Sequence, residues 1–182
     1  MRWILIALLL IVPAELRAQH EHEQAEHAEQ AEEAEHHATE AAGLDEAEIA
    51  GLLAGAGMDQ ALAAELNGYP GPKHVVELAE KLELSPDQLA QAQQLVASTV
   101  ARSKELGMQI VHQEEALSAA FADGAIDEDK LSQMVGEIAR LRAGLRLNHL
   151  SAHLKMAGIL SEAQRDRYSE LRGYSAEEHH GG

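Results

Sequence analysis

The 182-residue chain contains no cysteine, one phenylalanine, one tryptophan and three tyrosines. Without cysteine it can form neither a disulfide nor a thiolate metal site. The sequence also lacks a phosphate-binding loop, a nucleophile-elbow glycine pattern and an HExxH motif, so we do not expect an enzyme. Its abundant alanine, leucine, glutamate and glutamine favour helices, and the fold must therefore depend on apolar burial between helices.

Basic residues are scarce, with 14 Lys and Arg against 31 Asp and Glu, for a net charge of −17. The imbalance is greatest between Gln19 and Pro72, where acidic residues occur without any lysine or arginine. Nucleic acids and anionic lipids are bound through clustered cations, so neither is an expected partner. Metal cations and basic regions of unfolded proteins match this charge better.

A long apolar run is also missing. The ten apolar residues of Trp3–Val12 are fewer than the roughly 20 that a spanning helix needs. Together with Arg2 and the small residue Ala18 they are typical of a secretory signal peptide. We predict a signal peptide over residues 1–18, cleaved after Ala18 or after Ala14, and an exported protein. An uncleaved membrane anchor is the competing interpretation.

Residues 19–43 are a low-complexity segment of alanine, glutamate and histidine. Glutamates three residues apart repel one another in a helix, and little here can be buried, so we predict a disordered tail with latent helicity. The tail either binds Zn, Ni or Cu ions through imidazole and carboxylate groups or serves as a solubilising acidic segment. Its histidines are His20, His22, His27, His36 and His37. Residues 175–182 form a short C-terminal tail that carries two more histidines.

Residues 44–174 are predicted to form one all-α domain. Asp45 is an expected helix N-cap, with Glu48 three residues later, and the helix that it opens should reach about Leu66. A segment rich in proline and glycine then breaks the chain over residues 67–72. Pro72 is expected to open a short helix that runs from His74 to about Leu82.

Two long helices are predicted over residues 86–122 and 128–159, because apolar residues repeat in both at three- and four-residue spacing. The Asp123-Gly124 turn joins them into a long antiparallel hairpin, and Asp127 is the expected N-cap of the second helix. Gly107, in the middle of the first long helix, is a candidate position for a kink. A last helix should cover residues 162–172.

One five-residue motif occurs twice, directly before two of these helices: Leu84-Ser85-Pro86-Asp87-Gln88 and Leu160-Ser161-Glu162-Ala163-Gln164. In each copy the serine is an expected N-cap, and the glutamine can reach back to the backbone N–H of that serine. Leu84 and Leu89 form a hydrophobic staple around the first copy. Arg165 takes the place of Leu89 in the second copy, which weakens its staple.

The two motifs resemble the LTxxQ motifs of the Spy/CpxP family of periplasmic stress proteins, which includes metal-binding members similar to ZraP and CnrX. Serine replaces threonine here and keeps the capping hydroxyl. The resemblance implies a cradle-like homodimer in the periplasm and ATP-independent holdase or refolding activity on unfolded proteins during envelope stress. It also implies an alternative: a heavy-metal sensor or resistance protein, which would work with a membrane-bound regulator.

His149, His153 and Met156 fall in one patch of the second long helix, on its apolar stripe. Histidines four residues apart can ligate one metal ion, and a thioether suits Cu⁺. The competing interpretation is two hydrogen-bonded core histidines beside a space-filling methionine. His74 and Glu77 on the short helix either supply further ligands or lie in solvent.

Leu147, Leu150 and Leu154 form a second apolar strip on the same helix. An apolar surface on two sides indicates a homodimer or a surface that binds unfolded clients, unless the shorter helices cover it. Two functions are therefore expected as alternatives: a holdase that buries client apolar groups against this strip, and a metal-binding sensor or buffer.

Overall fold

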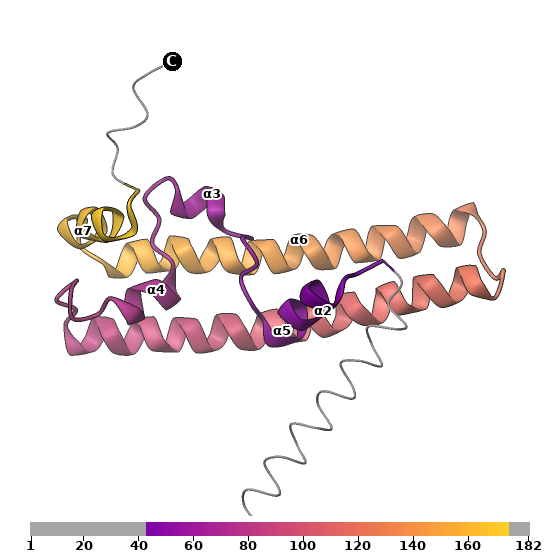
Figure 1. Ribbon diagram of the computed structural model, residues 1–182, viewed down its shortest axis with the longest axis horizontal. Coiled ribbons are helices and arrows are strands. Elements are labelled where there is room, and N and C mark those ends of the chain that lie inside the picture. The colour runs from indigo at the N-terminus through magenta and orange to yellow at the C-terminus, as the bar shows by residue number, and fades with distance from the viewer. Residues whose placement is uncertain (1–42, 175–182) are drawn as a thin grey trace, which may run out of the picture. The chain divides into compact units, whose positions relative to one another are not determined.

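The computed structural model describes residues 43–174, and these residues form six helices and no strand (Figure 1). The all-α prediction is confirmed for this range. The predicted signal peptide, the histidine-rich tail up to residue 42 and residues 175–182 lie outside the described residues. No helix within the described range combines the length and the apolar character needed to span a membrane.

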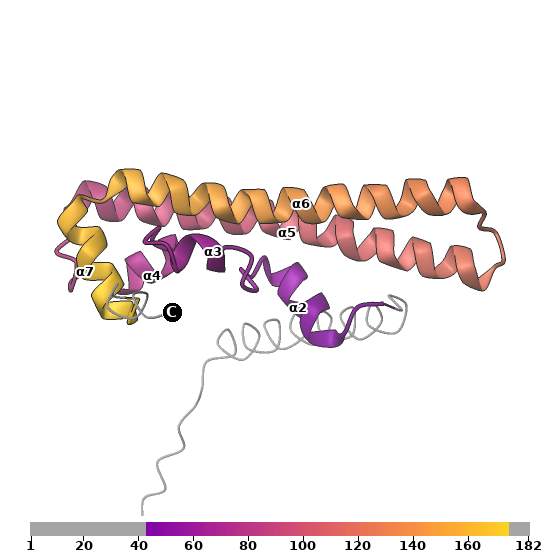
Figure 2. The ribbon, with the colours of Figure 1, turned by 90° about the horizontal axis from the view of Figure 1, so that it is seen from above.

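Two long helices lie side by side in both ribbon views (Figures 1 and 2). They are α5 (Pro86–Ala122) and α6 (Glu128–Ile159). The Asn148 side chain of α6 donates to the Thr99 carbonyl of α5 at 2.9 Å, and Arg142 donates to Glu114 at 3.1 Å. The later residue of α6, Asn148, thus contacts the earlier residue of α5, Thr99. The two helices therefore run in opposite directions.

Helix α2 (Glu46–Ala54) begins at the expected cap, since the Asp45 side chain accepts the Glu48 N–H at 2.7 Å. The prediction that this helix continues to Leu66 is wrong. It ends at Gly55, which has the left-handed φ of +66° common in helix C-caps. A loop over residues 55–61 follows, and helical structure resumes only in the one-turn α3 (Leu62–Glu65).

Gly107 is the point at which α2 approaches α5 most closely. A Cβ atom on Gly107 would lie 2.1 Å from the Leu52 carbonyl oxygen, so no larger residue fits without moving α2. Helix α5 continues through Gly107 without interruption. The glycine therefore provides room for a crossing helix, and the α5 segment does not break there.

The remaining short helices are α4 (Pro72–Glu77) and α7 (Glu162–Arg172). Pro72 opens α4 as predicted, at a position where the missing N–H costs nothing, but the helix ends at Glu77 and not at about Leu82. The α7 bounds match the prediction. Helices α2, α3 and α4 lie on one side of the α5–α6 pair (Figure 2).

The buried apolar residues form two separate clusters. The first joins α2 to both long helices and contains Leu44, Ile49, Leu52, Leu106, Ile110, Val111, Leu141 and Leu145. The second joins α4 and α7 to the opposite end of the pair and contains Val75, Leu82, Ala92, Met156, Leu160 and Tyr168. The shorter helices therefore cover the main apolar stripe of the long helices.

Candidate functional site

The two five-residue motifs meet in space through their glutamines. Gln88 Nε2 donates to Gln164 Oε1 at 2.9 Å, and Gln164 Nε2 donates back to Gln88 Oε1 at 3.1 Å. Both predicted capping boxes are confirmed, since each glutamine oxygen also accepts the N–H of its own serine, Ser85 at 3.0 Å and Ser161 at 2.9 Å. Each side-chain oxygen therefore serves a local cap and a distant motif at once.

The second hydrogen of each amide bonds to a backbone carbonyl just before the other motif. Gln88 Nε2 donates to the Ile159 carbonyl at 3.0 Å, and Gln164 Nε2 donates to the Leu82 carbonyl at 3.1 Å. Every donor and acceptor position of the two amides is thereby used. A glutamate would complete the capping box but could not donate these bonds, which explains why both copies carry glutamine.

Arg165 has a role that the sequence did not suggest. It stands where the first motif has its staple leucine, and its Nη1 donates to the Ala157 carbonyl at 2.9 Å and to the Leu160 carbonyl at 3.4 Å. These carbonyls belong to the last turn of α6, where backbone acceptors lack helical partners. Arg165 therefore caps the C-terminus of α6 in place of a hydrophobic staple.

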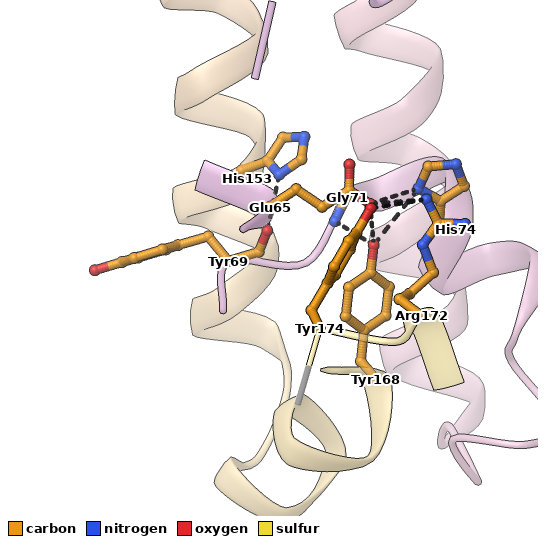
Figure 3. A network of polar contacts seen from close by, with 8 residues as sticks. All are labelled: Glu65, Tyr69, Gly71, His74, His153, Tyr168, Arg172 and Tyr174. Atoms are coloured by element: carbon orange, nitrogen blue, oxygen red, sulfur yellow. Dashed lines mark hydrogen bonds and ion pairs between the residues drawn. The ribbon is translucent and has the colours of Figure 1, made fainter. Parts of the chain in front are cut away.

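A polar network around Glu65 connects α3, α4 and α7 (Figure 3). Glu65 Oε1 accepts from the Tyr168 hydroxyl at 2.8 Å, from His74 Nδ1 at 3.0 Å and from Arg172 Nη2 at 3.2 Å. The Tyr168 hydroxyl also accepts the Gly71 N–H at 3.1 Å. The hydrogen-bond partner of His74 is thus Glu65, nine residues earlier in the sequence.

The network shifts the pKa values of Glu65 and Tyr168, which are joined by a hydrogen bond at its centre. Burial by itself would raise the pKa of Glu65, but the Tyr168 hydrogen bond and the charges of His74 and Arg172 outweigh it and lower that pKa. Burial, with the adjacent Glu65 carboxylate, raises the pKa of the Tyr168 hydroxyl. At neutral pH Glu65 is therefore a carboxylate and Tyr168 a donor.

The three predicted metal ligands of α6 have different surroundings. His149 is 9% exposed, and its Nε2 lies 3.0 Å from Ser103 Oγ. His153 is 8% exposed, and its Nδ1 donates to the Tyr69 carbonyl at 2.9 Å. Met156 is fully buried in the second core cluster. The structure thus places each histidine beside a protein hydrogen-bond partner and the methionine among apolar side chains.

Within residues 43–174 no three histidine or acidic side chains lie close enough together to form a metal-binding cluster. The five histidines of the N-terminal tail are outside the described residues.

The structure brings His74 close to two histidines of α6 that are far from it in the sequence. His74, His149 and His153 line one cavity of about 610 Å³, with Glu65 on the same wall. Most other lining residues are apolar or small, from the 54–62 segment, α5 and α6. No sequence pattern predicted this cavity, because the loop over residues 55–61 that lines one side of it was expected to be helical.

The predicted leucine strip lies on the uncovered side of α6. Leu147 is 64% exposed and Leu154 is 60% exposed, while Leu150 between them is half-buried. Arg146 and Lys155 are exposed next to them along the chain. The strip is therefore an accessible apolar surface with adjacent positive charges, although the chain as a whole is strongly acidic.

Comparison of the chain with protein-family models, curated proteins and solved structures gave no match.

Proposed function

We propose that this protein is a periplasmic holdase or refolding chaperone of the Spy/CpxP type, exported by a cleaved signal peptide and active without ATP. The observation that carries the proposal is the leucine strip of Leu147, Leu150 and Leu154, two of which are largely exposed on a long helix. An unfolded client would bury its apolar groups against this strip reversibly, and the acidic remainder of the surface would keep the complex in solution.

The arrangement of the two long helices as a hairpin and the pairing of the two motifs support this proposal. The glutamine pair holds the N-terminus of α5 next to the N-terminus of α7, and Gln88 also binds the Ile159 carbonyl, so this end of α5 is fixed to the C-terminus of α6. A rigid pair of this kind can present one continuous apolar face to a client. We further propose that two copies assemble as a cradle-like homodimer.

Aggregation of reduced lysozyme, followed by light scattering, tests the chaperone proposal. The full mature protein should suppress aggregation, and the double variant Leu147→Ser/Leu154→Ser should need at least about tenfold more protein for the same effect, because two leucine contacts contribute about 1.5–3 kcal/mol each when fully buried. Val135→Ser, which removes another exposed apolar residue of α6, is the matched control. Equal suppression by the wild type and the double variant would contradict the proposal.

Metal binding by the tail is a second proposal, supported by five histidines in a segment without lysine or arginine. Titration with Zn²⁺ should show binding to the mature protein that is lost when residues 19–43 are removed. Binding that survives this deletion but is lost in His149→Ala/His153→Ala would instead assign the ion to α6. Absence of Zn²⁺ binding to the mature protein would exclude both sites.

A further inference from the structure

The cavity that contains His149 and His153 has the size and lining of a small-molecule site. Its volume of about 610 Å³ falls within the roughly 300–1,000 Å³ of known ligand pockets. Val96, Val100 and Ala152 contribute apolar surface from the long helices, and the loop over residues 55–61 forms the opposite wall. The cavity is separate from the exposed leucine strip, so an inference about it goes beyond the chaperone proposal.

The hydrogen-bond partner of His153 determines which of its ring nitrogens is available to a ligand. The Tyr69 carbonyl can only accept, so His153 Nδ1 must carry the hydrogen that it donates at 2.9 Å. Figure 3 shows this bond and the imidazole ring beside it. In the neutral ring Nε2 is then left with a lone pair and acts as an acceptor.

The same argument assigns the opposite role to His149. Ser103 Oγ already accepts the Asn148 amide N–H at 3.0 Å. Among the described residues, the structure gives the buried Ser103 hydroxyl hydrogen one acceptor, His149 Nε2 at 3.0 Å, and a buried hydroxyl without an acceptor is unfavourable. His149 Nε2 therefore accepts, and its Nδ1 carries a hydrogen that is available to a ligand.

Both available nitrogens face glycines that line the cavity. A Cβ atom on Gly57 would lie 4.0 Å from His149 Nδ1, and a Cβ atom on Gly71 would lie 3.6 Å from His153 Nε2 and 3.2 Å from its Cε1. Gly71 has a φ of −74°, which any residue can adopt. Backbone conformation therefore does not require glycine at position 71, and the missing side chain avoids crowding of the His153 and His74 rings.

The loop that forms the opposite wall is conformationally strained. Met58 and Asp59 are consecutive residues other than glycine with left-handed φ values of +39° and +58°. Both line the cavity. Such backbone strain is concentrated at ligand sites and switch segments, where the surrounding structure maintains it.

We propose that this cavity binds a small uncharged molecule with an apolar body and a primary carboxamide or lactam group. His149 Nδ1–H donates to the carbonyl oxygen of that group, and its N–H donates to His153 Nε2. The two histidines are one helical turn apart on α6, and both line the cavity. A carboxylate would place an acceptor against His153 Nε2, and an ammonium would place a donor against His149 Nδ1–H.

Hexanamide, hexanoate and hexylamine are matched probes, because they share one apolar chain and differ in the polar group. We would titrate each into the full mature protein at about pH 8, where unperturbed imidazoles are neutral. Long-range ¹⁵N–¹H NMR of the histidine rings should show both rings protonated at Nδ1 before addition. Hexanamide should then shift His149 and His153 and bind at least about tenfold more tightly than the other two probes, given the loss of one or both hydrogen bonds.

His153→Phe should abolish the preference for hexanamide, whereas His112→Phe, at an exposed position of α5, should keep it. Gly57→Ala tests the site without altering an imidazole and should weaken hexanamide binding, because its methyl group enters the space before His149. The proposal fails if millimolar hexanamide shifts neither ring or if hexanoate or hexylamine binds equally well. Zn²⁺ binding at these two rings in preference to hexanamide would also overturn it.

Discussion

The paired glutamines show how one residue type can serve a helix cap and a tertiary contact together. We expect Gln88→Glu to destabilise the protein by about 1–3 kcal/mol, because the carboxylate cannot donate to the Ile159 carbonyl or to Gln164. Urea unfolding at neutral pH measures the change. Gln94→Glu, at an exposed position of the same helix, adds the same charge without these contacts and should cost little.

The double variant Gln88→Glu/Gln164→Glu extends this test. It would bring two carboxylates together, so its destabilisation should exceed the sum of the single changes by about 0.5–3 kcal/mol. Additive effects, or a Gln88→Glu effect no larger than that of Gln94→Glu, would show that the glutamine pair does not couple the two motifs.

His149 should make the stability of the protein depend on pH. Burial, and then the nearby His153, lower the pKa of His149 below its ordinary value. Near pH 6 the unfolded state therefore binds more protons than the native state, so stability is complete above the unfolded pKa of about 6.5 and falls as the pH drops below it. His149→Gln should flatten the fall measured by urea unfolding between about pH 7.5 and 5.

His112→Gln is the control for this measurement, because the His112 side chain is 78% exposed. It should leave the pH dependence of the wild type unchanged. The same slope in His149→Gln and in the wild type would show that His149 is protonated equally in the folded and unfolded states.

At the scale of helices, replacing a glycine by alanine should have opposite effects on stability at a crowded and at an open position. Gly107→Ala should destabilise the protein by more than about 2 kcal/mol, because its Cβ would overlap the Leu52 carbonyl and displace α2. Gly136→Ala should instead stabilise it by about 0.5–1 kcal/mol, because this site in α6 has open space around it and alanine favours the helix. Thermal unfolding of both variants provides the comparison, and equal effects would contradict the proposed crossing at Gly107.

The sequence predicted those helix ends that depend on local contacts. Asp45, Ser85, Asp127 and Ser161 each cap the helix that their position indicated, because the capping bond spans only three residues. The end of α2 was missed, since helix-favouring alanines and leucines continue on both sides of Gly55. The break becomes evident only in the packing, where a Cβ atom on Gly55 would lie 2.7 Å from the Val100 carbonyl oxygen. Local propensity does not contain this packing information.

The candidate site was less predictable than the fold for a similar reason. The sequence identified His149 and His153 as neighbours on one face, which follows from helical spacing. It could not identify their partners Ser103 and Tyr69, or the contact of Tyr168 with Glu65, since these pairs are separated by 46, 84 and 103 residues. Contacts of such separation depend on how the helices pack, and no periodicity within one helix encodes them.

At the scale of the whole described structure, the two apolar clusters share no residue, and the α5–α6 pair contributes residues to both. Between them lie the histidine-lined cavity and the polar contacts of Ser103, Asn148 and His149. Polar contacts and a cavity couple neighbouring regions less strongly than close apolar packing does. We therefore expect the α4–α7 end and the α2 end to open as separate cooperative units.

Tyr168→Phe tests this separation. The change removes the acceptor of the buried Gly71 N–H and one donor to Glu65, and should destabilise the α4–α7 end by about 1–3 kcal/mol. Hydrogen exchange followed by mass spectrometry should show faster exchange in α3, α4 and α7, with α2 and the middle of α5 still protected. Tyr69→Phe is the matched control, because its ring points away from the network in Figure 3. Uniform loss of protection in Tyr168→Phe would mean that both clusters unfold as one unit.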